Sequence, residues 1–174
     1  MQNPEERGFR AIFNNLTYEK ASWVLHMLRR IVGDETFFRA TRNYLGGEER
    51  EQYRSVTTTE FQQYMEDASG MDLDYFFQQW IFGEYYPTYE LKWEIAEQAG
   101  MHEVSVTIDQ LYLPQRQLFT MPVDLFFRFP GGTDTTIIVW NDEASATYTF
   151  TFSQPPAYVQ LDPDGWILKK VIEP

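Results

Sequence analysis

Cysteine is absent from the 174 residues of this sequence, and histidine occurs only twice, as His26 and His102. Without cysteine the chain forms no disulfide bonds and offers no thiolate to a metal ion or a substrate. The two histidines lack the spacing of a ligand pair, and we interpret His26 as a structural or surface residue. We therefore expect no metal site within this chain.

Basic residues are also scarce, with 14 lysines and arginines against 26 acidic residues and a net charge of -12. This balance opposes binding to nucleic acid or to an anionic membrane surface. No apolar run approaches the eighteen residues of a membrane-spanning helix. The first ten residues include the charged side chains Glu5, Glu6, Arg7 and Arg10 and no apolar core of a signal peptide. Both the cytoplasm and export remain open as locations.

Hydrophobic residues make up 43% of the sequence and aromatic residues 17%, as in a packed globular chain. In the first half, apolar residues recur at three- and four-residue spacing, which predicts helices. Glycines end the expected helices, and Thr57 and Glu60 form a capping box. The four expected helices cover residues 18–32, 34–45, 57–69 and 72–81. The last carries the bulkiest apolar stripe, so we expect it to be the most deeply buried.

From Tyr89 onward the hydrophobic period changes to two, which predicts strands. The seven expected strands cover residues 89–95, 104–108, 121–127, 135–140, 148–152, 157–161 and 166–172, with turn residues between them. Seven short strands without an intervening helix indicate an antiparallel β-sandwich. We therefore predict an α+β chain of two domains, a helical one over residues 1–86 and a seven-stranded β-sandwich over residues 87–174.

The segment from Tyr18 to Leu28 is the most informative part of the sequence. It reads Tyr-Glu-Lys-Ala-Ser-Trp-Val-Leu-His-Met-Leu and resembles the Tyr-x-Lys-Gly-Ala-x-Val-Leu-x-Met-Leu segment of the gluzincin zinc aminopeptidases, the family of aminopeptidase N and leukotriene hydrolase. The resemblance continues in the same order and spacing through Gly33-Asp34, Phe37-Phe38, Thr59-Glu60-Phe61, Glu66, Ser69-Gly70, Asp72-Leu73, Phe76-Phe77, Gln79-Trp80 and Tyr86-Pro87.

Three positions depart from the family pattern. Ala21 stands where glycine is usual, Ser22 where alanine is usual, and Tyr85 where a glycine usually precedes the Tyr-Pro pair. Beyond Pro87 the similarity rests on the predicted sandwich and on residues 159–166, which resemble the strand and turn near the end of the family's β-sandwich domain.

The resemblance implies a fold and an activity. Residues 1–86 would be the helical C-terminal part of a thermolysin-like catalytic domain, followed by the β-sandwich. The parent protein would be a zinc metallo-aminopeptidase that hydrolyses N-terminal residues from peptide substrates. The family's zinc ligands, a His-Glu-x-x-His motif and a further glutamate, are absent here and would lie upstream, so we expect this chain alone to be inactive.

Tyr18 is the one catalytic residue that the resemblance implies. In the family, the tyrosine at this position donates a hydrogen bond to the oxyanion that forms during peptide hydrolysis. A phenol stays protonated at neutral pH, and a helix can aim it rigidly into a cleft. The alternative is a tyrosine that only packs at a helix start. Lys20, typical of the same motif, is a candidate for orienting the site, or else a solvated or salt-bridged neighbour.

A second function remains open, a non-catalytic binding or scaffolding module of a peptidase-like protein. The presence or absence of the zinc motif upstream would separate the two. If an upstream half of the catalytic domain is missing, the helix over residues 18–32 would expose apolar surface that the upstream half covers in the longer protein. We therefore also expect the chain to self-associate.

Overall fold

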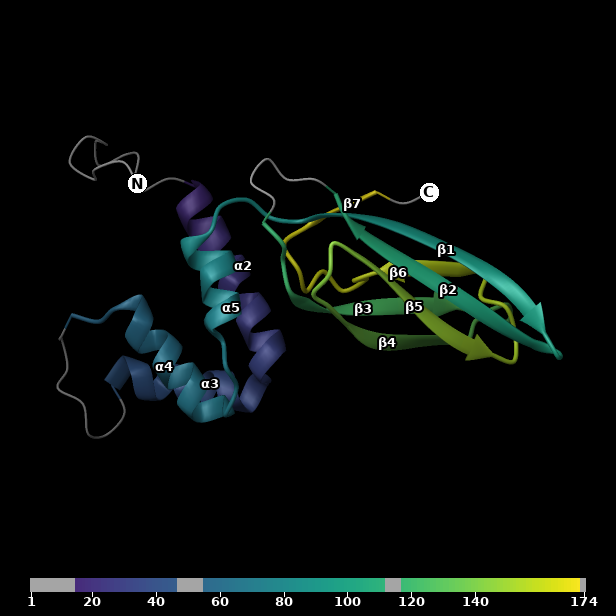
Figure 1. Ribbon diagram of the computed structural model, residues 1–174. Coiled ribbons are helices and arrows are strands. Elements are labelled where there is room, and N and C mark those ends of the chain that lie inside the picture. Colours follow the sequence, from purple (N-terminus) through teal and green to yellow (C-terminus); the bar gives the residue numbers. More distant parts are fainter. Residues whose placement is uncertain (1–14, 47–54, 112–116, 173–174) are drawn as a thin grey trace. The chain divides into compact units, whose positions relative to one another are not determined.

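The computed structural model describes residues 15–46, 55–111 and 117–172 (Figure 1). The chain forms two compact units, residues 1–73 and 74–174. Four helices and seven strands are found in the described parts, so the predicted α+β composition is confirmed. Among the described residues, no helix combines the length and apolar character that crossing a bilayer requires.

The first unit is helical. Its elements are α2 (Asn15–Val32), α3 (Asp34–Gly46) and α4 (Thr58–Ser69). The capping box predicted for α4 is present, because the Thr57 side chain accepts the Glu60 N–H while the Glu60 carboxylate accepts the Thr57 N–H. Gly70, with a φ of 69°, ends α4 in the left-handed conformation that glycine tolerates best.

Glu66 organises the turn that follows α4. Its side-chain oxygen Oε1 accepts the Leu73 N–H at 3.0 Å and the Gln62 side-chain amide at 3.0 Å. Its backbone carbonyl accepts the Gly70 N–H at 2.7 Å. The N–H of Leu73 is thus bonded to α4, and the next helix begins at Asp74, two residues after the predicted start at residue 72.

The apolar residues expected on α3 divide between two sides of the helix. Phe37 and Ala40 are buried, and the Tyr44 ring contacts Phe61 of α4 at a centroid distance of 5.0 Å. Phe38 and Leu45 are 51% and 74% exposed. Helix α3 therefore buries one side and exposes apolar side chains elsewhere on its surface.

The second unit begins with helix and continues as strands. It contains the short helix α5 (Asp74–Phe77), the π-helix η2 (Gln78–Phe82) and, in order, β1 (Thr88–Gln98), β2 (Met101–Gln110), β3 (Met121–Arg128), β4 (Asp134–Asn141), β5 (Ser145–Phe152), β6 (Tyr158–Leu161) and β7 (Lys170–Ile172). The strands form a four-stranded sheet of order β5-β2-β1-β7 and a three-stranded sheet of order β4-β3-β6.

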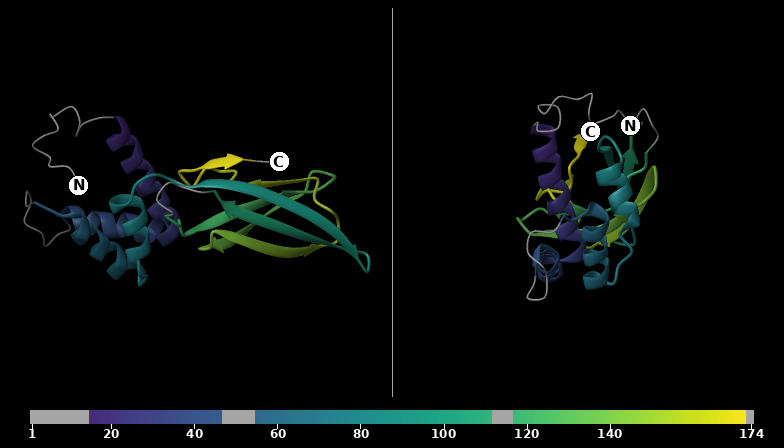
Figure 2. Two further views of the ribbon diagram at one scale, coloured as in Figure 1. Left: turned by 45° about the horizontal axis from the view of Figure 1, so that its top comes forward. Right: turned by 90° about the vertical axis from the view of Figure 1, so that its left-hand side faces the viewer.

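The two sheets contact each other through aromatic side chains. Phe127 of β3 lies 5.1 Å from both Phe150 and Phe152 of β5, measured between ring centroids. Figures 1 and 2 show the sheets as two layers. Val104, Val106 and Ile108 of β2 and Met121, Val123, Leu125 and Phe127 of β3 are fully buried. The period of two predicted for these strands is confirmed.

β7 differs from its predicted form in both length and direction. It begins at Lys170 and pairs parallel with Thr88–Glu90 of β1, whereas the sequence predicted an antiparallel strand from Trp166. The buried carboxylate of Asp162 accepts the backbone N–H groups of Trp166 at 2.8 Å and Ile167 at 2.9 Å. These bonds hold the residues after Asp162 in a turn, so they cannot join a strand.

The segment predicted as the fourth helix has the most buried side chains of the helical part. Phe76, Phe77 and Trp80 are fully buried, which confirms that expectation. Its second half is a π-helix, which the sequence did not predict. Segment 117–120 binds this π-helix, because Gln117 donates to the Gln79 carbonyl at 3.0 Å and Gln79 accepts the Thr120 N–H at 2.8 Å.

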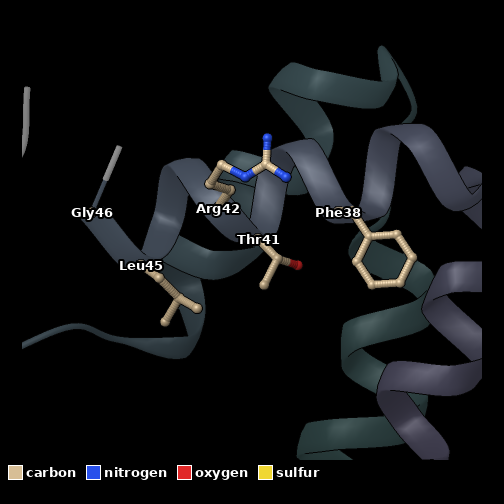
Figure 3. A pocket seen from close by; sticks show the side chains of 5 residues that line it. All are labelled: Phe38, Thr41, Arg42, Leu45 and Gly46. Atoms are coloured by element: carbon tan, nitrogen blue, oxygen red, sulfur yellow. The ribbon is translucent and has the colours of Figure 1, made fainter. Parts of the chain in front are cut away.

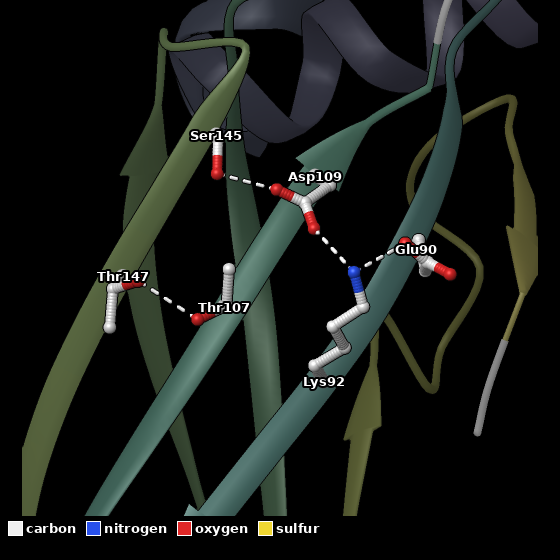
Figure 4. Close-up of polar contacts among 6 residues, drawn as sticks. All are labelled: Glu90, Lys92, Thr107, Asp109, Ser145 and Thr147. Atoms are coloured by element: carbon white, nitrogen blue, oxygen red, sulfur yellow. Dashed lines mark hydrogen bonds and ion pairs between the residues drawn. The ribbon is translucent and has the colours of Figure 1, made fainter.

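The outer surface of the four-stranded sheet is polar (Figure 4). Lys92 of β1 bridges Glu90 at 2.6 Å and Asp109 of β2 at 2.9 Å. Asp109 also accepts a hydrogen bond from Ser145 of β5. The Ser145 hydroxyl and, next, the Lys92 ammonium lower the pKa of Asp109 below its ordinary value. This surface therefore faces solvent in the isolated unit.

The change from helix to strand falls between Phe82 and Thr88, close to the predicted position. The two compact units divide earlier, between Leu73 and Asp74. The predicted domains 1–86 and 87–174 stay a prediction, since α5 and η2 join the strands in one unit here. In this link Tyr85 has a φ of 71°, the left-handed region.

We predict that Tyr85→Gly is better tolerated than Tyr86→Gly. Both rings are about half exposed, at 45% and 46%, so loss of the ring costs about the same at each position. Only Tyr85 has a positive φ, whose strain glycine relieves by about 1 to 2 kcal/mol. Urea denaturation should show the Tyr85→Gly variant more stable than Tyr86→Gly by that amount, and equal stabilities would contradict the prediction.

We also predict that Gly83→Ala destabilises the second unit. A Cβ at Gly83 would lie 2.5 Å from the Gln79 carbonyl oxygen and 2.5 Å from the Gln117 Nε2. Overpacking of this kind costs about 1 to 3 kcal/mol, measurable by thermal denaturation. Adding Gln117→Ala should not restore stability, because the backbone contact with Gln79 remains. An unchanged melting temperature for Gly83→Ala would disprove this steric account.

Candidate functional site

Helix α2 carries the candidate site and has one buried side. Val24, Met27 and Leu28 recur at three- and four-residue spacing and are 6%, 0% and 0% exposed. Arg29 and Arg30 in the last turn complement the negative end of the helix dipole. Burial of these apolar side chains fixes the rotation of α2 about its axis, and therefore the direction of every other side chain on it.

Tyr18 lies in the first turn of α2 and is 61% exposed. Its backbone carbonyl accepts a hydrogen bond from the Ser22 hydroxyl at 2.9 Å. Leu25, seven residues further on, is also exposed, at 43%. Tyr18, Ser22 and Leu25 therefore follow one side of the helix, with the phenol ring projecting outward from it.

A shallow hollow of about 410 Å³ lies along α2. It is lined by Glu19, Ser22, Trp23 and His26. The Trp23 and His26 rings are in edge-to-face contact with centroids 5.8 Å apart. The sequence predicted no site role for Ser22 or Trp23, although the spacing 19, 22, 23, 26 is that of one helix face. His26 lies in this hollow beside an indole, as a surface histidine.

Lys20 is half-buried and does not line this hollow. Residues two apart on a helix do not face each other, so Tyr18 and Lys20 project from different sides of α2. This geometry does not favour direct contact of Lys20 with the Tyr18 hydroxyl. The supporting role of Lys20 and the catalytic role of Tyr18 both stay predictions.

The corner between α2 and α3 is held by Arg29. Its guanidinium binds both carboxylate oxygens of Asp34, at 2.8 and 2.5 Å, and lies 5.1 Å from the centre of the Phe38 ring. The hydrogen bond from Arg29 lowers the pKa of Asp34 below its ordinary value. Because this pair is exposed to solvent, we assign it a role in orienting the two helices and little stability.

A second hollow, of about 640 Å³, lies along the exposed side of α3 (Figure 3). Phe38, Thr41, Arg42, Leu45 and Gly46 line it. Among the described residues, the lining is mainly apolar, includes one cation and has no acid or base arranged for catalysis. This hollow is an uncovered apolar helix side and does not have the chemistry of an active site.

The described residues form no cluster of three or more histidine, cysteine, aspartate or glutamate side chains that could hold a metal ion. What α2 offers chemically is the phenol hydroxyl of Tyr18, a hydrogen-bond donor on the exposed side of a firmly packed helix. Such a donor can stabilise negative charge that develops on a substrate oxygen. It cannot by itself supply a nucleophile.

Comparison with known proteins gives a family match over the first part of the chain. Residues 1–80 match the family described as the Peptidase family M1 domain. Aminopeptidase N of Lactococcus lactis subsp. lactis is 31% identical over 106 residues, which are 60% of this chain and 10% of that protein. The chain therefore spans about a tenth of the length of this curated relative.

A solved structure extends the comparison to the whole fold. Aminopeptidase A of Legionella pneumophila, in complex with aspartic acid, has a TM-score of 0.71 at 17% identity, covering 93% of this chain and 18% of that chain. At this identity the likeness shows the fold alone. Together with the family match and the relative, it shows that residues 1–80 are similar to the M1 peptidase domain and that the chain has the fold of an aminopeptidase segment.

Proposed function

We propose that this chain is part of a longer zinc aminopeptidase that removes N-terminal residues from peptides, and that Tyr18 is its catalytic contribution. One observation carries the proposal: Tyr18 projects from the exposed side of α2, while Val24, Met27 and Leu28 fix the opposite side in the core. The helix that bears this arrangement lies within the segment that matches the M1 family.

In the proposed mechanism, the Tyr18 hydroxyl donates a hydrogen bond to the scissile carbonyl oxygen as that oxygen gains negative charge. The donor acts most strongly in the transition state, where the charge is largest. A helix packed along one side holds the ring without reorganisation during the reaction. The Ser22 hydroxyl, bonded to the Tyr18 carbonyl, supports the first turn from which the ring projects.

Zinc, when bound in the longer enzyme, would activate the water that attacks the peptide. The described residues do not fit a zinc site, because they contain no metal-binding cluster. We therefore place the ligands in another part of the longer protein. Within this chain, the proposed roles are donation of the hydrogen bond by Tyr18 and site support by Lys20.

The proposal also assigns the two parts of the chain. Residues 1–86 would complete a thermolysin-like catalytic domain, and residues 87–174 would form the β-sandwich domain that follows it. The two layers of strands joined by the rings of Phe127, Phe150 and Phe152 support the sandwich assignment. The likeness to a solved aminopeptidase supports both domain assignments.

We predict that Tyr18→Phe in the longer enzyme lowers turnover about a hundred- to a thousandfold. The change keeps the ring and removes only the donor, so kcat and kcat/KM should fall together while zinc content and melting temperature stay unchanged. Steady-state kinetics on an aminoacyl anilide measures this. Tyr85→Phe is the matched control, because it removes the hydroxyl of a similarly accessible tyrosine in the same chain and should leave turnover unchanged.

Unchanged turnover in a folded, zinc-loaded Tyr18→Phe enzyme would reduce Tyr18 to a packing residue. A longer protein with neither zinc nor peptidase activity would instead favour the non-catalytic module.

We further predict that the 174-residue chain alone binds no zinc tightly and hydrolyses no aminoacyl anilide. One hydrogen-bond donor cannot generate a nucleophile, and zinc requires about three protein ligands at a catalytic site. Elemental analysis after dialysis against zinc should give far less than one equivalent. Stoichiometric zinc lost on replacing His26 or His102, together with turnover, would refute the assignment of the ligands to another part of the protein.

A further inference from the structure

The two sheets of the second unit end on one side in consecutive edge strands. β4 is the edge of the three-stranded sheet and β5 the edge of the four-stranded sheet, and residues 142–144 join them. In Figure 1 they follow the same side of the layered strands. Among the described residues, no strand pairs with the outer edge of either one, and the Tyr148 hydroxyl of β5 donates to the Trp140 carbonyl of β4 at 2.8 Å.

This side lacks the charges that usually protect exposed edges. Residues 135–141 and 144–161 contain no charged side chain, although the whole chain has a net charge of -12. By contrast, the edge of β1 beyond its pairing with β7 carries Lys92, Glu94 and Glu97. Natural proteins place charges on free edges because an uncharged edge invites pairing with another strand.

Side chains on the β4 and β5 side are also incompletely buried. Ile138 and Trp140 of β4 are 55% and 45% exposed, and Val139 between them is 8% exposed, so both lie on the outer face of their sheet. Phe152 of β5 faces the other sheet yet is only half-buried. Apolar side chains are therefore exposed beside the free edges.

We propose that β4 is a pairing edge for a second copy of this chain, aligned antiparallel and centred on Ile137. Residues opposite each other across a strand pair share one face of the sheet. In a symmetric antiparallel pair, the twofold axis must therefore pass through a residue and not between two residues. Centring on Ile138 would place Asp134 opposite Asp142 of the second copy, and parallel pairing would place Asp134 beside Asp134. Centring on Ile137 opposes no like charges.

In this register Thr136 of each copy lies opposite Ile138 of the other, and the two three-stranded sheets become one continuous sheet. The pairing satisfies the outward N–H and C=O groups of β4. Repulsion between two copies of charge -12 opposes it at low ionic strength, so association should strengthen as salt screens that repulsion. The inference does not depend on the proposed peptidase function.

Sedimentation equilibrium of the 174-residue chain tests the proposal. We expect a concentration-dependent dimer that is tighter at about 0.5 M than at about 0.05 M NaCl. Ile138→Lys should weaken it at least about tenfold, because a charge then lies on the pairing edge. Ile95→Lys, the same change at an exposed position of β1, is the matched control and should leave the dimer intact.

The register is tested by charge exchange. In the Thr136→Asp, Ile138→Lys double variant, each lysine lies opposite an aspartate of the second copy, so two cross-strand ion pairs form. The dissociation constant should return to within about threefold of that of the natural sequence. Non-specific apolar aggregation would not be rescued by adding charge. Melting temperatures establish that each variant is folded, which is expected because both positions are exposed.

Several results would overturn the proposal. A natural sequence that stays monomeric at high concentration and high salt would assign the edge of β4 to a different occupant, such as another segment of a longer protein. A dimer dispersed by Leu25→Lys on α2 and not by Ile138→Lys would place the interface on that helix. A double variant as weak as Ile138→Lys alone would exclude the Ile137 register.

Discussion

Everything proposed for α2 depends on one packing constraint, the burial of Val24, Met27 and Leu28 along a single side. A helix has one rotational freedom about its axis, and three buried side chains on one side remove it. Tyr18 then has to project from the exposed side, and Lys20 from a different direction. The exposed stripe is thus a consequence of core formation. The packing of α2 alone fixes the direction of a hydrogen-bond donor placed on that stripe.

The second unit depends on a few backbone positions that hydrophobic patterning does not specify. Gly83 has no room for a Cβ beside Gln79 and Gln117, and Tyr85 adopts a left-handed conformation where the family usually has glycine. These two positions flank the passage from η2 to β1. The departure at Tyr85 therefore concerns the backbone of the link, and its strain is tolerated because burial of Trp80 and Tyr89 on either side holds the chain ends in place.

Charge is distributed unevenly between the two sides of the layered strands. Lys92 is held between Glu90 and Asp109 near the β1 edge, whereas β4 and β5 carry no charge between Thr135 and Asn141 or along the whole of β5. An exposed edge strand stays unpaired only when its sequence disfavours pairing with a strand of another chain. This contrast connects the composition of the sequence to the topology of the sheets, since the uncharged runs matter only because both strands lie at edges.

The sequence by itself determined the four helices, the capping box at Thr57 and Glu60, the seven strands and the burial of Phe76, Phe77 and Trp80, because these follow from local spacing and local hydrogen bonds. Only the tertiary structure decided that Phe38 and Leu45 are uncovered, that η2 is a π-helix, and that β7 is short and parallel. Each of these depends on a partner distant in sequence: α4 for α3, Gln117 for η2, and Thr88–Glu90 of β1 for β7. Hydrophobic periodicity predicts which side of a segment is buried. Contacts between residues far apart in the sequence decide which element buries it.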